Sequence, residues 1–371
     1  MDVDSFFEAL ENQYVNKLPF VVYSRPINSI VKCWLQEDDT THYTENFTES
    51  GFVFSPFNLD DKSILLPQEK CEHYALKLDN FDVVPPKNDF KIDASNKNKH
   101  IHLVTKGIDA IKNKDLEKVV LSRNVKTPTN TSQPLKTFKQ LFNTYKNAMV
   151  YCWYHPKVGL WLGATPELLF KIEGKQLTTI SLAGTQPFVA NKKVIWTNKE
   201  IEEQQIVTDY ITHQIQPYTT AINVSAVETV RAGNLLHLKS RIISYISTAT
   251  SLKSVIEALH PTPAVCGFPK EDAKKFILEN ENYKREYYTG FLGELNLKQA
   301  KTRNTNRRNV ENNAYAVVKT QSNFYVNLRC AQLQYNVALI YVGGGITKDS
   351  VAENEWEETV NKTKTIGSIL N

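Results

Sequence analysis

The chain has 371 residues, which at roughly 150 residues per domain fits two or three domains or one large α/β or α+β unit. Apolar side chains make up 41% of it and charged ones 23%, close to the globular average, which argues against a disordered, collagenous or coiled-coil protein. No run reaches the ~18 apolar residues of a membrane helix, and the acidic start MDVDSFFEAL lacks the basic and apolar regions of a signal peptide. We therefore expect a cytoplasmic protein with no membrane partner.

Charge and cysteine content limit the kinds of partner. Forty-four Lys and Arg against 40 Asp and Glu leave a net charge of +4, too little for the whole-molecule field that drives nucleic-acid binding. This net charge does not argue against small anionic molecules as ligands. The five cysteines are odd in number and include no CxxC spacing, so we expect reduced thiols and neither a disulfide framework nor a zinc knuckle at Cys33, Cys71, Cys152, Cys266 and Cys330.

The first half of the chain is rich in predicted strands. Residues 1–95 contain no pattern that indicates chemistry, and their clearest strand is GFVFSPF at 51–57. Apolar spacing predicts an amphipathic helix at 101–116, and β-branched residues predict a strand at 117–125. Short strands then follow one another closely at MVYCWYH, GLWLG, ELLFKIEG and QLTTISL.

The second half mixes helices with further strands. Helical spacing is found at 194–216, a strand at 235–247, and helices near 251–259 and 269–280. Strands are predicted at YTGFLGELN, AYAVVK, FYVNLRCAQL and VALIYVGGG, and a last helix from about 350. Because helices separate clusters of strands instead of alternating with them, the pattern predicts an α+β fold of large antiparallel sheets with helices outside.

Two of the predicted helices carry acids on apolar faces. In the helix at 194–216, Glu203 shares a face with Ile206, Val207 and Tyr210. Burying a carboxylate without a partner costs several kcal/mol, so this placement implies either a cation nearby or a mistaken helical phase. The alternative is a solvated acidic face formed by Glu200, Glu202 and Glu203, and spacing alone favours that alternative.

The last helix shows the same feature on one face, which contains Val351, Glu355, Glu358, Lys362, Ile366 and Ile369. The simple explanation is an exposed Glu358–Lys362 pair that contributes ~0.3 kcal/mol. However, the run YVGGGITKDS places three glycines between a strand and this helix, where backbone N–H groups can bind an anion. An anionic ligand held together with a divalent metal would explain both features. Mg²⁺ needs one or two protein carboxylates, and Glu203 and Glu358, with Glu355 in reserve, are the candidates.

Further candidate residues lie in or beside predicted strands. Lys118 shares a strand face with Val120 and Ser122, where loss of hydration lowers a lysine pKa toward the range of a base, although edge-strand lysines are common. Glu167 follows a GATP turn and is either a loop acid or a proton donor. Arg329 in FYVNLRC offers a fork suited to a carboxylate or is a structural strand residue. We expect core or hydrogen-bonding roles for His237 and His260, which lack HExxH spacing.

Ten sequence blocks in fixed order over residues 118–365 resemble the chorismate-utilising enzymes, and within them the isochorismate synthases. They are KVVLSR, GATPELLF, LAGTQP, KEIEEQQIV, LLHLKS, LHPTPAVCGFP, REYYTGFLGE, VNLRC, GGGIT and EWEETVNKTKT. The resemblance implies one α+β unit of two packed antiparallel sheets with helices outside. We therefore expect 1–371 to form a single chorismate-binding unit, with 1–95 as its variable N-terminal part and 96–371 as its motif-bearing catalytic part.

The resemblance also implies roles for individual residues. Lys118 matches the base that deprotonates the attacking water, and Glu167 matches the acid that protonates the departing hydroxyl. The matching Mg²⁺ ligands are Glu203 and Glu358, with Glu355 acting through water. The substrate-binding groups implied are Ala183, Gly184, Thr185, Arg329, Gly344, Gly345 and Lys362. The implied reaction adds water at C2 of chorismate and displaces the C4 hydroxyl, which makes the enzyme an isomerase serving menaquinone or siderophore biosynthesis.

Two positions separate this chain from relatives with other reactions. Ammonia-using relatives typically have glutamine where Lys118 stands, and aminodeoxychorismate synthases have a nucleophilic lysine where this chain has Ala183 in SLAGT. We expect no glutaminase subunit and a monomer. A departure is the common Glu-His pair, which here is Glu203-Gln204, so the contact made by that histidine is in question.

Two alternatives remain open. A salicylate synthase would make isochorismate and then eliminate pyruvate in the same pocket. A more distant alternative is a nucleic-acid or interaction module that uses the basic segment 301–308, which includes Lys301, Arg303, Arg307 and Arg308. This segment belongs to the polar, basic stretch 297–313, which separates two predicted strands. The stretch has no counterpart that we can match in the family. We predict that it forms a mobile hairpin extension.

Overall fold

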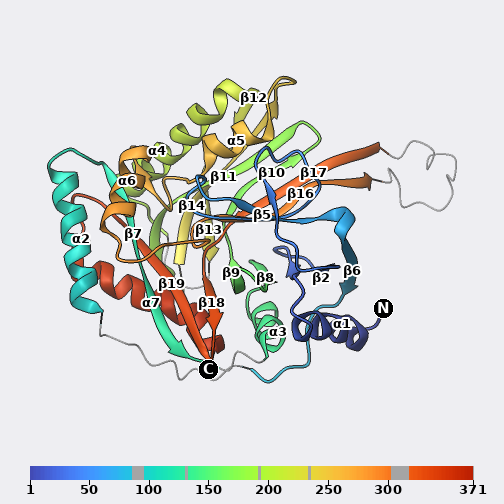
Figure 1. The fold of residues 1–371 in the computed structure, drawn as a ribbon. Coiled ribbons are helices and arrows are strands. Elements are labelled where there is room, and N and C mark those ends of the chain that lie inside the picture. The colour runs from blue at the N-terminus through green and yellow to red at the C-terminus, as the bar shows by residue number, and fades with distance from the viewer. Residues whose placement is uncertain (86–95, 130–132, 191–193, 233–234, 302–316, 371) are drawn as a thin grey trace.

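Two large sheets pack against each other in the computed structural model, which describes residues 1–85, 96–129, 133–190, 194–232, 235–301 and 317–370 (Figure 1). Every strand pairing that the structure describes is antiparallel. The predicted α+β fold of two large antiparallel sheets with outer helices is therefore confirmed.

The first sheet has nine strands in the order β15-β7-β19-β18-β9-β8-β1-β2-β6. Their bounds, in that order, are Gly267–Phe268, Lys118–Pro128, Val337–Ile346, Cys330–Gln334, Gly159–Thr165, Met149–His155, Phe20–Ser24, Ile30–Gln36 and Cys71–Lys77. The order brings strands that are far apart in the sequence into direct contact, so residues near 120 and near 343 share one surface.

The second sheet has ten strands: nine follow the order β12-β14-β11-β10-β17-β16-β4-β5-β3, and the tenth, β13, pairs with β14 beside them. The bounds of the strands in that order are Thr219–Val224, Leu235–Ile246, Gln176–Pro187, Leu168–Glu173, Val317–Val326, Phe291–Lys301, Gly51–Ser55, Ser63–Pro67 and His42–Thr44, and β13 is Glu228–Ala232. Both sheets contain strands from the first 77 residues, so the N-terminal part is built into the same core.

Helices cover the outer faces of the two sheets. In chain order they are α1 Val3–Val15, α2 Lys97–Lys112, α3 Pro134–Thr144, α4 Asn198–Ile215, α5 Leu252–Leu259, α6 Lys270–Asn280 and α7 Ala352–Leu370. The helices α2 and α7 lie against β7 and β19 of the first sheet, whereas α4 lies against β11 and β14 of the second (Figure 1). No helix in the described part of the chain is long and apolar enough to cross a membrane. None of the five cysteines, all buried, is in a disulfide.

One predicted strand is wrong in an informative way. The sequence predicts a single strand at 324–333, with Arg329 inside it. In the structure β17 ends at Val326 in the second sheet and β18 begins at Cys330 in the first. Arg329 has a φ of +49°, in the left-handed region that ordinary residues avoid, so the chain turns out of one sheet and enters the other there.

The strand predicted at VALIYVGGG is confirmed as β19, but the anion-binding turn inferred from its glycines is wrong. Gly343, Gly344 and Gly345 lie inside β19 and pair with Ser122, Leu121 and Val120 of β7, and α7 begins only at Ala352. One edge of the glycine run is therefore paired with β7, whereas among the described pairings β18 joins the other edge only as far as Ile340, and the glycines do not form a turn directly before a helix. What the glycines provide is a strand surface without side chains, over which neighbouring residues can extend.

Several elements were not predicted from the sequence. Every residue of β1, FVVYS, is buried, so polar and apolar residues do not alternate along it. The helices α1 and α3 and the strands β12 and β13 were missed as well. The hairpin extension predicted at 297–313 lies largely outside the described residues, since β16 runs to Lys301 and the description resumes at Val317.

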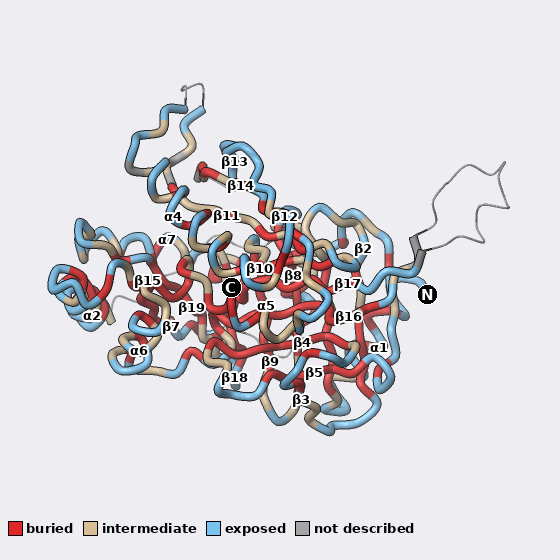
Figure 2. Tube along the Cα trace, turned by 90° about the horizontal axis from the view of Figure 1, so that it is seen from above, coloured by how far each residue is buried: buried red, intermediate tan, exposed pale blue. Residues whose placement is uncertain are grey.

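An aromatic layer fills the space between the sheets. Phe54 of the second sheet stacks on Trp153 of the first at 4.5 Å between ring centroids, and Tyr287 stacks on Phe54 at 4.3 Å. The buried strands of the interior, drawn in red in Figure 2, form a continuous centre with exposed loops around it. Apolar burial of this kind is the main favourable contribution to folding.

One charged group also joins the two sheets. Glu294 of β16 is only 1% exposed, and its carboxylate accepts hydrogen bonds from Tyr23 Oη at 2.5 Å and Lys32 Nζ at 2.7 Å, both in the first sheet. Burial by itself would raise the pKa of Glu294, but Lys32 and Arg25 hold that pKa below its ordinary value. The carboxylate therefore remains charged and links the sheets through directed bonds.

Removing this carboxylate should destabilise the fold. Glu294→Ala leaves Lys32 and Arg25 without their acidic partner and is expected to lower the free energy of unfolding by about 3 kcal/mol, measured by urea denaturation. Asp39→Ala is the matched control, because Asp39 forms an exposed ion pair with Lys157 at 3.2 Å, and such pairs contribute little. Equal, small losses for both variants would contradict the linking role of Glu294.

Candidate active site

Two chain crossings between the sheets run side by side and form the base of the candidate site. One crossing leads from β9 to β10 through Glu167, and the other from β17 to β18 through Arg329. They are tied together by Val326 N–H to Glu167 O at 3.0 Å and by Ala164 N–H to Arg329 O at 3.0 Å. Thr165 Oγ1 also donates to Val326 O at 2.6 Å. This junction brings two of the predicted site residues together.

The carboxyl group of Glu167 has an unusual environment. Burial raises its pKa from 4.5 to about 7, although Lys118, Lys362 and Arg329 act in the opposite direction. A carboxyl with a pKa near 7 is partly protonated at neutral pH and can donate a proton. Of the two possibilities left open by the sequence, a loop acid or a proton donor, this environment favours the donor.

Lys118 begins β7 and is the centre of a charged cluster. Burial lowers its pKa below the ordinary lysine value; Glu203, Glu167 and Glu358 raise it, and Lys362 lowers it. The ammonium therefore lies within electrostatic reach of acids from α4, from the β9–β10 crossing and from α7. A lysine that is partly removed from water and surrounded by such groups is suited to gain and lose a proton.

The N-terminal half of α7 supplies acids and a cation above β19. Lys362 Nζ lies 2.5 Å from Glu358 Oε1 and donates to Gly343 O at 2.9 Å. A Cβ atom added at Gly344 would lie 3.3 Å from Glu355 Oε2 and 3.7 Å from Glu358 Oε1. The glycine strand therefore leaves room for these side chains, and the predicted face of Glu355, Glu358 and Lys362 is confirmed.

The rest of that predicted face needs one correction. Val351 precedes the helix and is 51% exposed, so the apolar stripe does not include it. The Glu358–Lys362 pair is only partly solvated, with 49% of the Glu358 side chain and 27% of the Lys362 side chain exposed. The pair is therefore neither fully exposed nor buried. Its lysine, Lys362, points toward the glycine strand and bonds to Gly343 O.

The face predicted for α4 is shifted. Ile206 is 62% exposed, whereas Gln204, Val207 and Thr208 are buried, so the helix packs through a face one residue away from the predicted one. Glu203 lies at the border of this buried face and is partly buried. That border position explains how its carboxylate acts on Lys118 while remaining accessible to a cation.

The predicted ring-pocket wall lies on a distorted part of β11. The pairing of β11 with β14 shifts register between Ala183 and Thr185, which leaves Gly184 as an extra residue with a φ of +71°. Such bulges are common beside active sites. A Cβ atom at Gly184 would lie 3.1 Å from the Cβ of Glu200, so the glycine allows α4 to approach the strand closely.

His237 lies at the site, where the sequence predicted only a core or hydrogen-bonding role. His237 is on β14, opposite Thr185 of β11. Its Nδ1 is 3.3 Å from Gly184 O, so the hydrogen-bonding role is confirmed. Burial lowers the pKa of His237; the Gly184 carbonyl raises it, and the cations Arg329 and Lys362 lower it. Strand pairing between β11 and β14, which a single sequence does not reveal, was the missing signal.

Arg329 is held close to α7. Its Nη1 lies 3.4 Å from Thr365 Oγ1, and burial lowers its pKa below the usual arginine value. The side chains of Tyr288, Glu358, Tyr145 and Glu167 all act on it and raise the pKa. The guanidinium therefore belongs to the same electrostatic group as Lys118 and Glu167, although the strand predicted to carry it does not exist.

A buried ion pair supports the strand that carries Lys118. Arg285 donates from Nε to Glu281 Oε2 at 2.8 Å and from Nη2 to Val120 O at 2.7 Å. Glu281 Oε1 accepts from Ser122 N–H at 2.7 Å. β15 pairs with β7 only at Lys118 and Val119. Along the next residues of the same edge of β7, the side chains of Arg285 and Glu281 make the hydrogen bonds that a neighbouring strand would otherwise make.

The chemistry of the candidate acids limits which metal they could hold. Among the described residues, no group of three or more His, Cys, Asp or Glu is arranged to hold an ion. A zinc site would need such a group, but Mg²⁺ commonly uses one or two carboxylates and completes its shell with water and substrate oxygens. Glu203, Glu355 and Glu358 offer only oxygen atoms, which suits that kind of shared site.

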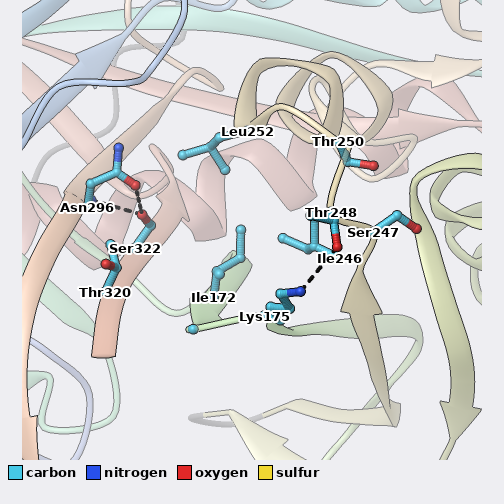
Figure 3. A pocket seen from close by; sticks show the side chains of 11 residues that line it. Ile172, Lys175, Ile246, Ser247, Thr248, Thr250, Leu252, Asn296, Thr320 and Ser322 are labelled. Carbon is cyan, nitrogen blue, oxygen red and sulfur yellow. Dashed lines mark hydrogen bonds between the residues drawn. The ribbon is translucent and has the colours of Figure 1, made fainter. Parts of the chain in front are cut away.

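A separate pocket lies away from these residues. It has a volume of about 250 Å³ and opens beside the turn between β10 and β11 (Figure 3). Within it Lys175 Nζ bonds to Thr248 Oγ1 at 3.2 Å, and Ser322 Oγ bonds to Asn296 Oδ1 at 3.2 Å. Its described lining contains no acid, histidine or cysteine, and Lys175 is the one titratable side chain in that lining.

Comparison with known proteins identifies the family to which the chain belongs. A family model described as a chorismate binding enzyme matches residues 63–301, more than half of the chain, and a second model with the same description matches residues 314–368. The chain therefore belongs to the chorismate-binding enzymes. The first matched range includes Lys118, Glu167 and Glu203, and the second includes Arg329 and Glu358.

The individual relatives carry a narrower description. The chain is 29% identical over 286 residues to isochorismate synthase MenF of Escherichia coli (strain K12), which covers 73% of this chain and 59% of that protein. It is 28% identical over 262 residues to the vibriobactin-specific isochorismate synthase of Vibrio cholerae serotype O1 (strain ATCC 39315 / El Tor Inaba N16961), which covers 68% and 61%. The alignments thus span about 60% of the length of these curated relatives.

The fold is also similar to that of a solved structure. A putative 2,3-dihydroxybenzoate-specific isochorismate synthase, DhbC, from Bacillus anthracis superposes with a TM-score of 0.75 at 22% identity, covering 98% of this chain and 100% of that one. The resemblance to the chorismate-utilising enzymes, drawn from ten sequence blocks, is confirmed.

Disrupting the buried ion pair should loosen β7. Glu281→Gln removes the charge that Arg285 faces in a buried setting, with an expected loss of about 3 kcal/mol in the free energy of unfolding. Hydrogen exchange at the Ser122 amide should become faster, because its acceptor is weakened. The control is Glu279→Gln, two residues earlier in the last turn of α6 and in an exposed pair with Lys275. Unchanged exchange at Ser122 in Glu281→Gln would contradict the edge-supporting role.

Proposed function

We propose that the protein is a Mg²⁺-dependent isochorismate synthase, an isomerase that converts chorismate to isochorismate. The observation that carries this proposal is the placement of Lys118 and Glu167 within one electrostatic cluster, with the pKa of the lysine lowered and that of the acid raised. Membership of the chorismate-binding enzymes and the names of the relatives support the substrate and the product.

The proposed chemistry needs a base and an acid. Water is a poor nucleophile and hydroxide a poor leaving group, so addition at C2 requires removal of a proton from water, and loss of the C4 hydroxyl requires delivery of one. In our proposal neutral Lys118 takes the proton from the attacking water. Protonated Glu167 gives its proton to the departing hydroxyl, which leaves as water. One water enters and one leaves, so atoms and protons balance.

The remaining residues bind and orient the substrate. Arg329, Lys362 and the backbone around Gly344 and Gly345 would hold its two carboxylates, and Ala183, Gly184 and Thr185 would form the wall beside the ring. Glu203 and Glu358, with Glu355 acting through water, would hold Mg²⁺, which supplies positive charge to fix the ring carboxylate. Arginine pairs with carboxylates through two parallel bonds, which sets orientation as well as affinity.

Product analysis tests this function. The protein is incubated with chorismate and Mg²⁺, and the products are separated by chromatography. Isochorismate as the sole new product is expected. Salicylate and pyruvate formed without a second enzyme would instead indicate the salicylate synthase alternative, and no consumption of chorismate would reject both. The nucleic-acid alternative rests on 301–308, of which residues 302–308 lie outside the described residues.

Replacing the proposed base should stop turnover without abolishing binding. Lys118→Ala is expected to lower kcat by at least ~100-fold, the usual size of a general-base contribution, while chorismate affinity changes much less. Both quantities come from steady-state kinetics and equilibrium binding. Lys126→Ala, at an exposed position on the same strand, should behave like the wild type. Retained turnover in Lys118→Ala would dismiss it as the base.

Replacing the proposed acid should affect both turnover and the pH dependence of stability. Glu167→Gln cannot donate the required proton, so a kcat loss of at least ~100-fold is expected. The folded pKa of Glu167, about 7, lies above the ordinary 4.5, so its stabilising contribution is present below pH 4.5 and is lost as the pH rises through about 7. Relative to the wild type, Glu167→Gln should therefore gain stability over that range in urea unfolding. A constant stability difference would contradict the raised pKa.

Removing a proposed metal ligand should weaken metal and substrate binding together. Glu358→Ala is expected to raise the Mg²⁺ concentration that gives half-maximal activity by ~10-fold or more, with a higher KM for chorismate. The neighbouring Glu357 is exposed, so Glu357→Ala serves as the control. An unchanged Mg²⁺ requirement in Glu358→Ala would count against a metal held between α4 and α7.

A further inference from the structure

A group of buried polar side chains surrounds Gln204, the residue that follows Glu203 in α4. Gln204 of α4 is 2% exposed, and its Nε2 donates to Thr208 Oγ1 at 2.9 Å and to Ser240 Oγ at 3.0 Å. The Thr208 hydroxyl lies 2.7 Å from Ser181 Oγ, which is also 3.4 Å from Gln204 Nε2. The group therefore ties α4 to β11 through Ser181 and to β14 through Ser240.

This polar group connects elements that carry predicted site residues. Ser181 and Ser240 are paired across β11 and β14. Two residues beyond Ser181, the strand β11 reaches Ala183 at the ring-pocket wall, and three residues before Ser240, β14 carries His237. Glu203 is next to Gln204 in the helix. A displacement of Gln204 relative to the two strands would therefore move Glu203 relative to the ring pocket.

The helix is held against β11 at a second point nearby. At Gly184 an added Cβ atom would lie 3.1 Å from Glu200 Cβ and 3.2 Å from Glu200 O, so helix and strand are in close contact there. Contact at Glu200 and directed bonds at Gln204 fix the helix on both sides of Glu203. Apolar packing is not directional, so by itself it would restrict the position of Glu203 less than these hydrogen bonds do.

Packing is incomplete on the other side of Gln204. A pocket of about 220 Å³ lies between α4 and the segment 224–227, and Gln204, Thr208 and Ser240 line it. On this side the hydrogen-bonded group of Gln204, Thr208 and Ser240 therefore faces a cavity and not packed apolar side chains. Both N–H groups of the amide are used in the two short bonds, so a side chain without donors would leave the hydroxyls of Thr208 and Ser240 without this partner.

From this geometry we propose that Gln204 is a positioning residue that sets the place of Glu203 relative to the ring pocket and thereby the affinity for Mg²⁺. The inference rests on the proposed function and goes beyond it, since Gln204 is not among the residues proposed to bind metal or substrate. Groups that orient metal ligands typically contribute 10- to 100-fold in metal affinity. The effect should fall on metal binding, with little effect on the rate at saturating Mg²⁺.

The test uses Gln204→Leu in the full chain, with Gln205→Leu as the matched control. Gln205 is the next residue, and its amide makes a single exposed bond to Asp209 Oδ1 at 2.7 Å. Isothermal titration with Mg²⁺ should show an affinity ~10-fold weaker for Gln204→Leu and unchanged for Gln205→Leu. The Mg²⁺ concentration for half-maximal chorismate conversion should rise by a similar factor, while kcat at saturating Mg²⁺ changes less than ~3-fold.

A milder variant keeps the test valid if Gln204→Leu does not fold. Ser240→Ala removes one acceptor and should weaken Mg²⁺ binding in the same direction by ~5-fold, as expected for one hydrogen bond. Wild-type Mg²⁺ affinity in either variant, even with lower stability, would overturn the positioning role and leave a purely structural one. If the wild type itself neither converts chorismate nor binds Mg²⁺, the proposed function fails and the inference fails with it.

Discussion

The site depends on the burial of opposite charges at the place where the chain passes between the two sheets. Removing Lys118 and Glu167 from water disfavours the charged form of each, so the pKa of the lysine falls and that of the acid rises to about 7. The same burial strengthens the interactions with Glu203, Glu358 and Lys362. A lysine and a carboxyl with pKa values shifted toward each other can exchange protons with a substrate between them, which neither could do as readily on the surface.

The fold supplies this junction through its two crossings. Two β-sheets packed face to face need connections that leave one sheet and join the other, and here two such connections lie side by side and bond through Glu167 and Arg329. The aromatic layer and the Glu294 cluster keep the sheets together, and the Arg285–Glu281 pair supports the edge of β7. The side chains proposed as catalytic are thus placed on backbone that is fixed from several directions, as preorganised chemistry requires.

Periodic patterns predicted part of this arrangement from the sequence. The spacing of Glu355, Glu358 and Lys362 identified the right helix face, because three- and four-residue offsets are a local property. The break at Arg329 was missed because no glycine or proline marks it, and its positive φ arises from the tertiary fold. The glycine run was predicted to end a strand, but the anion-binding turn inferred from it was wrong, since a single sequence does not show that β7 pairs with these glycines. The contacts of Gln204 and His237 also depend on pairing between distant strands.

The central claim is that side chains from α4, α7, β7 and the β9–β10 crossing act on one bound substrate. It is tested most directly by a crystal structure with Mg²⁺ and isochorismate. The account predicts one ion bound by both Glu203 and Glu358, with Lys118 and Glu167 on opposite faces of the ring. A ligand bound elsewhere, such as in the pocket beside Lys175, or acids that bind separate ions, would contradict it.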